Sequence, residues 1–324
     1  MEKSSKIFIA GHRGLVGGGI HRDLARRGYT NLLLRTRAEL DLTRAVDVDK
    51  FFQRERPEYV FLAAAKVGGI LANNTMPADF LRENLAIQSS VLNAAQATGV
   101  RRLLFLGSSC IYPRLAPQPI REEYLLTGPL ELTNRPYAVA KIAGIEMCWA
   151  FNRQYGTKFI AAMPTNLYGP GENLDLATSH VLAALLRKTI EAKAAGKKKI
   201  TIWGTGTPRR EFLFSDDLAE ACVFLMNLPD EKFESLLRAD EPPLLNIGTG
   251  EDLTIRELAE LICRMVGFDG ELVFDPSKPD GTPRKLLDVS RIHALGWKAQ
   301  TTLEQGIRKT AKDFADRLTP ILNL

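Results

Sequence analysis

The stretch LFLGSSCIYP, residues 104–113, places a hydroxyl and a thiol two residues apart where an apolar run ends. An extended chain alternates its side chains between two faces, so Ser108 and Cys110 should point to one side and Ser109 to the other. A serine hydroxyl can donate a hydrogen bond to a substrate oxygen, and a thiol can carry a proton. The competing interpretation is that a small cysteine fills space beside a serine that ends a strand.

The stretch RPYAVAK, residues 135–141, places Tyr137 and Lys141 one helical turn apart, so their side chains share a face. An unperturbed tyrosine loses its proton at about pH 10. We expect the neighbouring ammonium and a positively charged nicotinamide to favour the phenolate, which would let Tyr137 act as acid or base near neutral pH. Either residue alone is more simply part of a helix face. Together with Ser108 and the glycine loop described next, they indicate proton transfer at a substrate oxygen.

The first apolar run leads into GHRGLVG, in which Gly11, Gly14 and Gly17 follow the spacing GxxGxxG. Glycine permits a tight turn, lets backbone N–H groups approach a pyrophosphate and allows close packing of helix on strand. The N-terminus of the following helix favours negative charge. Three glycines could form a plain turn, but their place between a strand and a helix favours a dinucleotide site.

The second apolar run ends in LLRTR, where NAD-binding proteins commonly carry an Asp or Glu for the ribose hydroxyls. Guanidinium groups match a phosphate with paired hydrogen bonds, so we expect Arg13 and Arg37 to hold the 2′-phosphate of NADP(H). Arg35 is interpreted as a surface residue. Asp41, in ELDLT, is the expected partner of the adenine amino group.

Short apolar runs alternate with helical patterns in the first half of the chain, which indicates an α/β fold with a doubly wound parallel sheet of the Rossmann type. Most runs are apolar throughout, as parallel strands covered on both faces must be. Ligands of such folds gather at the carboxyl ends of the strands, where every motif above falls. The expected strands are residues 6–11, 31–36, 59–65, 102–109 and 158–169, and the expected helices are residues 17–28, 45–55, 77–99 and 137–155.

Composition narrows the class of protein. The chain has 324 residues, 45% of them hydrophobic, which suffices for roughly two domains with a substantial core. Its four cysteines lack CxxC spacing and its N-terminus lacks the apolar stretch of a signal peptide, so we expect a cytoplasmic protein without a metal site. No apolar run approaches the ~20 residues of a membrane span, so no membrane partner is expected.

The net charge of +5 does not indicate nucleic-acid binding, because basic and acidic residues are interspersed along most of the chain. The one dense cluster, Lys197 to Lys199 beside Gly196, is most simply a solvated turn. A mild positive excess suits small polyanions such as dinucleotides and sugar nucleotides.

The glycine loop together with Ser108, Tyr137 and Lys141 resembles the extended short-chain dehydrogenase/reductases that act on nucleotide sugars. More specific strings extend the resemblance from Lys6 to about Lys309, namely AAAKVGGILANNTMPADF, LGSSCIYP, PYAVAKIAG, MPTNLYGP, WGTGTPRREFL and SKPDGTPRKLLDVS. The resemblance implies an NADP-dependent bifunctional enzyme. Its substrate would be GDP-4-keto-6-deoxy-D-mannose, epimerised at carbons 3 and 5 and then reduced by NADPH at the 4-keto group.

The ketone of such a sugar acidifies the protons on carbons 3 and 5, and their removal gives an enolate that Ser108 and Tyr137 would stabilise. Inversion requires a proton to leave one face of the ring and another to arrive on the other. Cys110 is one candidate for this role, and the resemblance implies that His180 is its opposite number. From the residues alone, His180 is more simply a surface residue at a helix start. In the reduction, Tyr137 would supply the proton and Lys141 would orient the ribose.

The resemblance also implies which residues contact the ligands. The expected cofactor contacts are Gly11, His12, Arg13, Gly14, Leu15, Val16, Gly17, Arg37, Asp41, Leu42, Leu106, Gly107, Lys141, Pro164, Thr165, Asn166, Leu167 and His180. The expected substrate contacts are Lys188, Trp203, Arg210 and Asp280. Lys188 and Arg210 could hold the diphosphate. Trp203 offers a flat apolar surface, with a place in the core as its alternative.

The chain departs from the family pattern at three places. Thr178 stands where an Asn is expected, Ala183 where a Pro is expected, and Phe214 with Ser215 where His-Val is usual. None of these departures removes a reacting group.

We expect an NADP-binding domain of residues 1–165 with a return segment of about 212–249, and a substrate-binding domain of residues 166–211 and 250–324. The helical segments 77–99 and 137–155 carry a second apolar stripe, which predicts a homodimer.

Two other functions stay open at this point. One is a nucleotide-sugar 4-epimerase or 4,6-dehydratase of the same fold, although a dehydratase would be expected to have Thr-Asp/Glu-Glu where this chain has Ser109, Cys110 and Ile111. The other is a catalytically silent NADP-binding regulator. The joint presence of the proton-transferring residues argues against it.

Overall fold

The apolar runs of the first half form one parallel sheet. The computed structural model, which describes residues 1–175, 179–278 and 280–322, places six strands in the order β2-β1-β3-β4-β5-β9. Five of the six are buried along their whole length, which explains their continuous apolar sequence. The predicted α/β fold class is confirmed. The strands are β1 (Ile7–Ala10), β2 (Leu32–Leu33), β3 (Tyr59–Leu62), β4 (Arg102–Leu106), β5 (Phe159–Pro164) and β9 (Leu244–Ile247).

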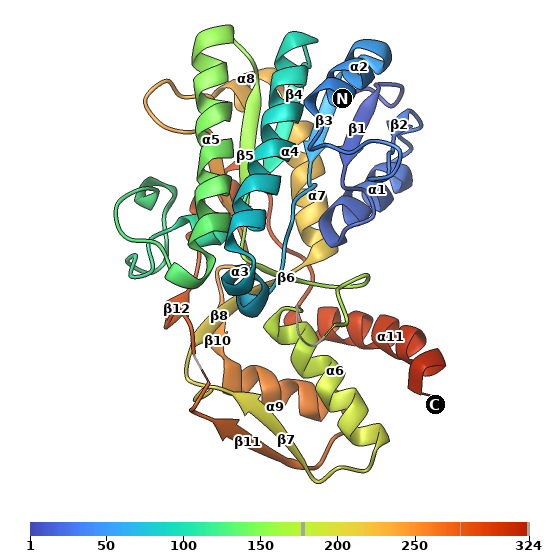
Figure 1. Cartoon of the computed structure of the whole chain (residues 1–324), viewed down its shortest axis with the longest axis vertical. Helices are drawn as coiled ribbons and strands as arrows, with labels where there is room; N and C mark the ends of the chain where they lie inside the picture. Colours follow the sequence, from blue (N-terminus) through green and yellow to red (C-terminus); the bar gives the residue numbers. More distant parts are fainter. Residues whose placement is uncertain (176–178, 279, 323–324) are drawn as a thin grey trace.

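Helices cover both faces of this sheet (Figure 1). One face carries α2 (Ala45–Glu55), α4 (Pro77–Ala97) and α5 (Arg135–Tyr155), which pack side by side. On the other face, α1 (Leu15–Arg26) packs against α7 (Ser215–Met226). The four predicted helices are confirmed, and each end lies within two residues of its predicted position.

The predicted strands 59–65 and 102–109 each end three residues early, at Leu62 and Leu106, and two other predicted strands differ more from the structure. Only Leu32–Leu33 of residues 31–36 pair with β1. Residues 158–169 form two strands, because the chain changes sheets at Thr165: β5 pairs with β4 and β9, whereas β6 (Asn166–Tyr168) pairs with β8 (Arg209–Phe214). A continuous apolar run does not reveal such a change of partner. The predicted lysine-rich turn follows Gly196, but Lys199 already begins β7 (Lys199–Trp203).

The strands of the second part form two smaller sheets below the first in Figure 1. In one, β8 lies between β10 (Asp252–Thr254) and β12 (Arg284–Lys285) and also pairs with β6; in the other, β7 pairs with β11 (Glu271–Asp275). Three helices, α6 (Val181–Ala194), α9 (Ile255–Val266) and α11 (Leu303–Leu322), pack against one another beside them. The remaining elements are α3 (Ile70–Thr75), α8 (Asp230–Glu234), α10 (Ser290–Leu295) and the 3-10 turns η1 (Ser109–Ile111), η2 (Glu122–Tyr124) and η3 (Leu132–Asn134).

Each part has its own apolar core. The second part is centred on Tyr168, Phe212 and Phe314, which are almost fully buried. Ile292 and Trp297 belong to the core of the six-stranded sheet although they follow residue 250. The domain boundaries given above stay a prediction.

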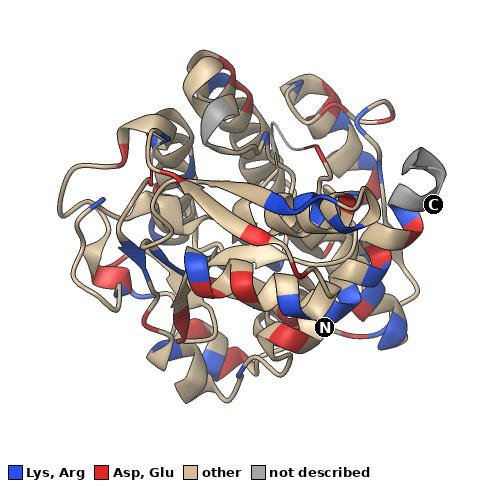
Figure 2. Ribbon diagram, turned by 90° about the horizontal axis from the view of Figure 1, so that it is seen from below, with Lys and Arg blue, Asp and Glu red and all other residues tan. Residues whose placement is uncertain are grey.

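The surface mixes both signs of charge. Figure 2 shows basic and acidic residues interspersed along the helices, without a segregated half of either sign. Among the residues described, no helix is long and apolar enough to cross a membrane.

The carboxylate of Glu211 joins the two parts. It is fully buried on β8, where Oε1 accepts hydrogen bonds from the N–H groups of Thr249 (2.6 Å) and Gly250 (2.9 Å), and Oε2 accepts one from Leu287 N–H (2.9 Å). Its backbone carbonyl accepts from the side chain of Asn166 at 2.8 Å. One residue therefore holds the segments that follow β9, β12 and β5. Burial is the main reason that the pKa of this carboxyl is raised.

Removing this carboxylate should destabilise the whole chain. In Glu211→Ala, three backbone N–H groups lose their acceptor, and each buried unsatisfied donor costs about 1–3 kcal/mol, so we expect the free energy of unfolding to fall by at least about 3 kcal/mol. Urea denaturation measures the change. Glu251→Ala, at an exposed neighbouring position, is the control and should shift the midpoint little. Equal midpoints for the two variants would contradict the joining role of Glu211.

Candidate active site

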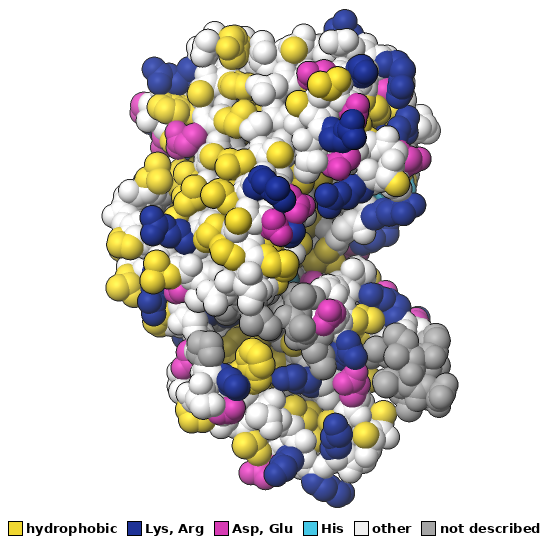
Figure 3. Space-filling view, in the orientation of Figure 1, with side chains coloured by type: hydrophobic (Ala, Val, Ile, Leu, Met, Phe, Trp, Pro, Cys, Tyr) yellow, Lys and Arg dark blue, Asp and Glu magenta, His cyan; other side chains and the backbone are white. Residues whose placement is uncertain are grey.

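A cleft of about 880 Å³ lies where the two parts of the molecule meet. Figure 3 shows the surface hollowed at this junction. Most of the residues predicted as functional line the cleft; His12 and Arg13 are the predicted residues that do not. Those that do are Gly11, Gly14, Leu15, Val16, Gly17, Arg37, Asp41, Leu42, Leu106, Gly107, Ser108, Cys110, Tyr137, Lys141, Pro164, Thr165, Asn166, Leu167, His180, Lys188, Trp203, Arg210 and Asp280.

The glycine loop is shaped by backbone contacts that exclude side chains. Gly11 has φ +87°, and a Cβ there would lie 2.8 Å from the backbone of Ala64. A Cβ on Gly17 would lie 2.2 Å from the carbonyl oxygen of Gly11. Gly14, at the N-cap of α1, provides no side-chain cap, and among the described residues no side chain caps this end of the helix, whose first residues line the cleft. This is the cradle that a pyrophosphate requires.

Arginines border the cleft beyond this loop. Arg37 is 73% exposed, with its guanidinium 3.6 Å from the Glu83 carboxylate. Arg35, interpreted above as a surface residue, instead lines the cleft half-buried, because its guanidinium stacks over the ring of Phe51 at 5.5 Å. Arg13 is exposed and outside the cleft lining. The structure therefore places Arg35 and Arg37, and not Arg13, at the border of the cleft beyond the glycine loop.

Asp41 and His12, two titratable residues predicted to contact the cofactor, both have lowered pKa values. The backbone N–H of Thr43 is the main reason that the pKa of Asp41 is lowered, since it donates to the carboxylate at 3.0 Å; the Thr43 hydroxyl adds a bond of 2.8 Å. Burial, and then the charge of Arg13, lower the pKa of His12.

The predicted alternation after β4 is wrong. The strand ends at Leu106, and Ser109–Ile111 form the 3-10 turn η1 instead of continuing extended. Ser108 caps this turn, its hydroxyl accepting a hydrogen bond from Cys110 N–H at 3.3 Å. Ser108 and Cys110 nevertheless both line the cleft, because a tight turn brings residues two apart close together.

Tyr137 and Lys141 lie on α5 as predicted. Lys141 is 3% exposed, and its ammonium donates to the Leu106 carbonyl at 2.7 Å, which ties α5 to the end of β4. Burial lowers the pKa of Lys141 to about 7. Burial, and then the charge of Cys110, raise the pKa of Tyr137, while a hydrogen bond with Ser108 acts in the other direction. The phenolate predicted from the sequence is therefore not favoured by the protein itself, which keeps Tyr137 protonated as a proton donor.

Cys110 contacts two residues that sequence reasoning missed. Asn134 Nδ2 donates to its sulfur at 3.2 Å and Lys285 Nζ at 3.8 Å. Lys285 lies in the string SKPDGTPRKLLDVS, but nothing in that string indicates a contact with Cys110. Desolvation by the surrounding walls of the cleft, followed by the charge of Lys285, lowers the pKa of His180, although the side chain keeps a surface open to the water of the cleft. The imidazole, at the N-cap of α6, is therefore mainly neutral at neutral pH and able to accept a proton.

The predicted substrate residues lie at the other end of the cleft. Trp203 is 57% exposed, so the alternative of a core residue is wrong, and the ammonium of Lys188 lies 5.8 Å from its ring. Arg210 lies half-buried on β8. Both carboxylate oxygens of Asp280 accept hydrogen bonds from Thr205, at 2.8 and 2.9 Å, so Asp280 fixes the loop after Trp203.

Of the departures from the family pattern, Ala183 is buried in α6, and Phe214 and Ser215 are buried where β8 meets α7. Thr178 lies outside the described residues.

Comparisons with known proteins agree with this geometry. Residues 7–248 match the model of the NAD dependent epimerase/dehydratase family. GDP-L-fucose synthase 1 of Arabidopsis thaliana is 56% identical over 95% of this chain and 93% of its own length. GDP-L-fucose synthase of Escherichia coli K12 is 54% identical over 96% of this chain and 97% of its own. A solved structure of a Campylobacter jejuni GDP-mannoheptose C4 reductase with NADP bound has a TM-score of 0.87 and 42% identity, covering 97% of this chain and 99% of that one.

The arrangement of arginines predicts cofactor preference. Removing the charge of Arg37 in Arg37→Ala should weaken NADPH binding by about 1.5–3 kcal/mol, the usual value of a hydrogen bond to a charged group, and leave NADH binding almost unchanged. Titration of the protein into each reduced cofactor, followed by the fluorescence of its nicotinamide ring, measures the two affinities. Arg44→Ala, an equally exposed arginine outside the cleft lining, is the control. Equal losses for NADPH and NADH would refute a 2′-phosphate site at Arg37.

Proposed function

Because the chain belongs to the NAD dependent epimerase/dehydratase family, we propose that it has the activity of its GDP-L-fucose synthase relatives. It converts GDP-4-keto-6-deoxy-D-mannose to GDP-L-fucose by epimerisation at carbons 3 and 5 and NADPH-dependent reduction of the 4-keto group. The observation that carries this proposal is that Ser108, Tyr137 and Lys141 share one cleft with Cys110 and His180.

NADP(H) fits the first half of the cleft. The fit rests on the backbone cradle at Gly11 and Gly17, which any Cβ would fill, and on the open N-terminus of α1. We assign the cofactor contacts to Gly11 and the loop residues 14–17, to Arg37, Asp41 and Leu42, to residues 106–107 and 164–167, and to Lys141 and His180. When bound, NADPH supplies the hydride for the reduction.

Epimerisation depends on holding the ketone oxygen. Ser108 and Tyr137 donate hydrogen bonds to that oxygen, which stabilises the enolate formed when a neighbouring carbon loses its proton. Cys110 and His180 exchange protons with the ring from opposite faces. The neutral imidazole and the thiol can each carry a proton, which inversion requires.

Reduction uses the same oxygen. Tyr137, kept protonated by its burial, donates its proton to the oxygen as the ketone becomes an alcohol. Lys141, fixed by the Leu106 carbonyl, orients the ribose of the cofactor and stabilises the phenolate that remains. Epimerisation and reduction thus share Tyr137 as a hydrogen-bond donor to the ketone oxygen.

The nucleotide of the substrate occupies the end of the cleft near Trp203. Its exposed indole offers a face for stacking, and Lys188 and Arg210 supply positive charge for the diphosphate. Asp280 acts by holding the loop that follows Trp203.

A homodimer through α4 and α5 is part of the proposal. Figure 3 shows apolar side chains gathered over the region of these helices, and Val139 and Tyr155 on α5 are 41% and 50% exposed. A second copy packed about a two-fold axis would cover this face. We also propose the cytoplasm as its compartment and the two-domain division given above.

Tyr137→Phe tests the reduction. Loss of the hydroxyl removes the proton donor, so the variant should fold and bind NADPH but reduce the ketone at least about 100-fold more slowly, as expected for a lost general acid. Consumption of NADPH, followed at about 340 nm, measures the reaction. Tyr155→Phe, on the exposed end of the same helix, should retain wild-type turnover. Substantial turnover by Tyr137→Phe would place the proton donor elsewhere.

Cys110→Ala and His180→Asn test the epimerisation. Without the thiol, the substrate should stop exchanging its carbon 3 and carbon 5 protons with deuterated water, while NADPH binding persists. Without the imidazole, exchange without inversion is expected, because a proton taken from one face cannot be delivered to the other. Proton NMR with NADPH withheld isolates this step. Cys263→Ala, outside the cleft lining, is the control; a wild-type exchange rate in Cys110→Ala would mean that the thiol only fills space.

A further inference from the structure

This inference rests on the proposed function, in which one pair of proton carriers, Cys110 and His180, inverts both carbon 3 and carbon 5. The hydrogens on carbons 3 and 5 of a D-manno ring are both axial and on the same face of its ordinary chair. Each inversion therefore uses the base and the acid of the pair in the same roles. After the first inversion, the base holds an extra proton and the acid lacks one. Both Cys110 and His180 must exchange a proton before the second inversion.

The two carriers differ in their access to water. His180 is exposed at the N-cap of α6 and borders the open cleft. Cys110 is half-buried, and the side that faces the cleft is the side a bound sugar would cover. Its other neighbours are protein groups, with Asn134 and Lys285 donating to the sulfur. A proton that reaches Cys110 beside bound substrate must therefore travel past these groups.

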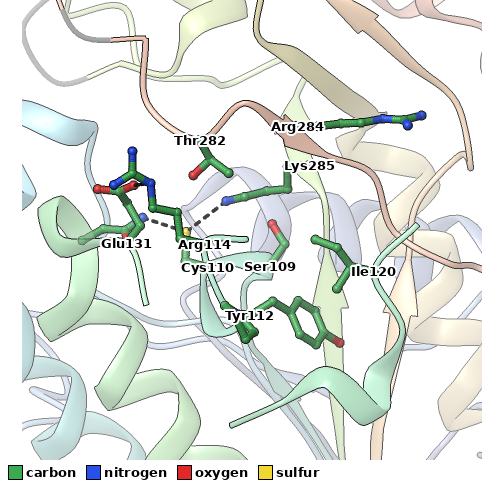
Figure 4. Close-up of a pocket in the computed structure, with 11 residues that line it drawn as sticks. Ser109, Cys110, Tyr112, Arg114, Ile120, Glu131, Thr282, Arg284 and Lys285 are labelled. Atoms are coloured by element: carbon green, nitrogen blue, oxygen red, sulfur yellow. Dashed lines mark hydrogen bonds and ion pairs between the residues drawn. The ribbon is translucent and has the colours of Figure 1, made fainter. Parts of the chain in front are cut away.

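A small cavity of about 10 Å³ adjoins Cys110 on this protein side (Figure 4). It shares walls with the cleft at Cys110, Glu131, Asn134 and Lys285. A space of about this volume holds one water molecule, provided that its walls offer polar partners. Figure 4 shows Glu131 and Arg114 on one side of the sulfur and Lys285 on the other.

Two acceptors on these walls have spare capacity. Glu131 Oε2 and Asn134 Oδ1 are buried, and within the described part of the chain neither accepts a hydrogen bond. Buried polar atoms are normally hydrogen-bonded. A water molecule in the cavity would satisfy both atoms and lie beside the sulfur.

Glu131 connects the cavity with solvent. Its Oε1 accepts from the Thr133 N–H and hydroxyl, each at 3.4 Å, and Arg114 Nε lies 3.2 Å from Oε2. The side chain of Glu131 is 17% exposed and that of Arg114 is 50% exposed, so water reaches this carboxylate from outside. The other charged groups around the cavity, Arg114, Arg284 and Lys285, are cations without an acceptor atom. Glu131 is the carboxylate among the described residues that line the cavity, and a carboxylate can accept a proton from solvent and donate it again.

We propose that Glu131, through one water molecule in this cavity, exchanges protons between solvent and the thiol of Cys110 between the two inversions. When Cys110 has given its proton to the ring, the water protonates the sulfur and takes a proton from Glu131, which recovers one from solvent. When Cys110 has instead removed a proton from the ring, the same proton transfers occur in the opposite direction, from the sulfur through the water to Glu131 and solvent. One proton crosses in either direction and no other bond changes. Glu131 does not touch the substrate and acts through Cys110.

The test is the isosteric variant Glu131→Gln, whose amide cannot exchange a carboxyl proton. Single turnovers of the keto sugar in deuterated water, with enzyme in excess and NADPH withheld, are followed by proton NMR. The first inversion should stay within about two-fold of the wild-type rate and the second should slow roughly 100-fold, at the lower end of what a positioned acid–base group supplies. A singly inverted ketone then accumulates. Glu123→Gln, at an exposed glutamate of η2, should give the doubly inverted sugar.

Two further variants separate a relay from a structural role. Glu131→Asp keeps a carboxylate and should restore much of the second inversion. Glu131→Ala opens the site to small acids, and added formate should speed its second inversion without changing its first. NADPH binding confirms that each variant is folded.

The outcomes distinguish the possible failures. A wild-type second inversion in Glu131→Gln, equal slowing of both inversions, or no effect of formate on Glu131→Ala would overturn the relay. If the wild-type protein exchanges deuterium at neither carbon, the proposed function itself fails.

Discussion

The buried carboxylate of Glu211 is the constraint on which the two-part architecture depends. A charge-bearing group without exposure to water is stable only when its oxygens are fully hydrogen-bonded, and here three backbone N–H groups from two distant segments provide the bonds. Because the same residue also anchors the crossing from β5 to β6 through its carbonyl, the six-stranded sheet and the smaller sheet are fixed relative to each other. The cleft exists because these two bodies meet at a defined separation.

Partial or complete removal from water also sets the protonation states in the cleft. Desolvation penalises the charged form of each group, so it lowers the pKa of Lys141 and His180 and raises that of Tyr137. A phenol that keeps its proton and an imidazole that lacks one are the states from which proton transfer can begin. Burying Lys141 has a cost in stability. Between its folded pKa of about 7 and its ordinary pKa, Lys141 holds a proton in the unfolded chain but not in the folded protein. The free energy of unfolding should therefore increase as pH rises across this range.

The sequence predicts elements and motifs well and long-range contacts poorly. Apolar runs and glycine spacing are local signals, and they located the parallel strands, the glycine loop, and Tyr137 with Lys141 on one helix. The partners of Cys110 lie 24 and 175 residues away in the chain, so no local pattern could reveal Asn134 or Lys285. The split of residues 158–169 and the stacking of Arg35 on Phe51 escaped prediction for the same reason, since each depends on a neighbour brought in by the fold.

The exposure of Trp203 gives the protein an optical property of its own. Of the three indoles, Trp297 is buried in the core and Trp149 lies half-buried on α5 beneath the guanidinium of Arg153, so neither borders the cleft. Trp203 alone among them stands in the cleft, more than half exposed, at the end assigned to the nucleotide. A purine stacked on that ring would change indole emission, whereas a ligand held only at the glycine loop would leave this indole in water. Intrinsic fluorescence can thus distinguish occupancy of one end of the cleft from occupancy of the other.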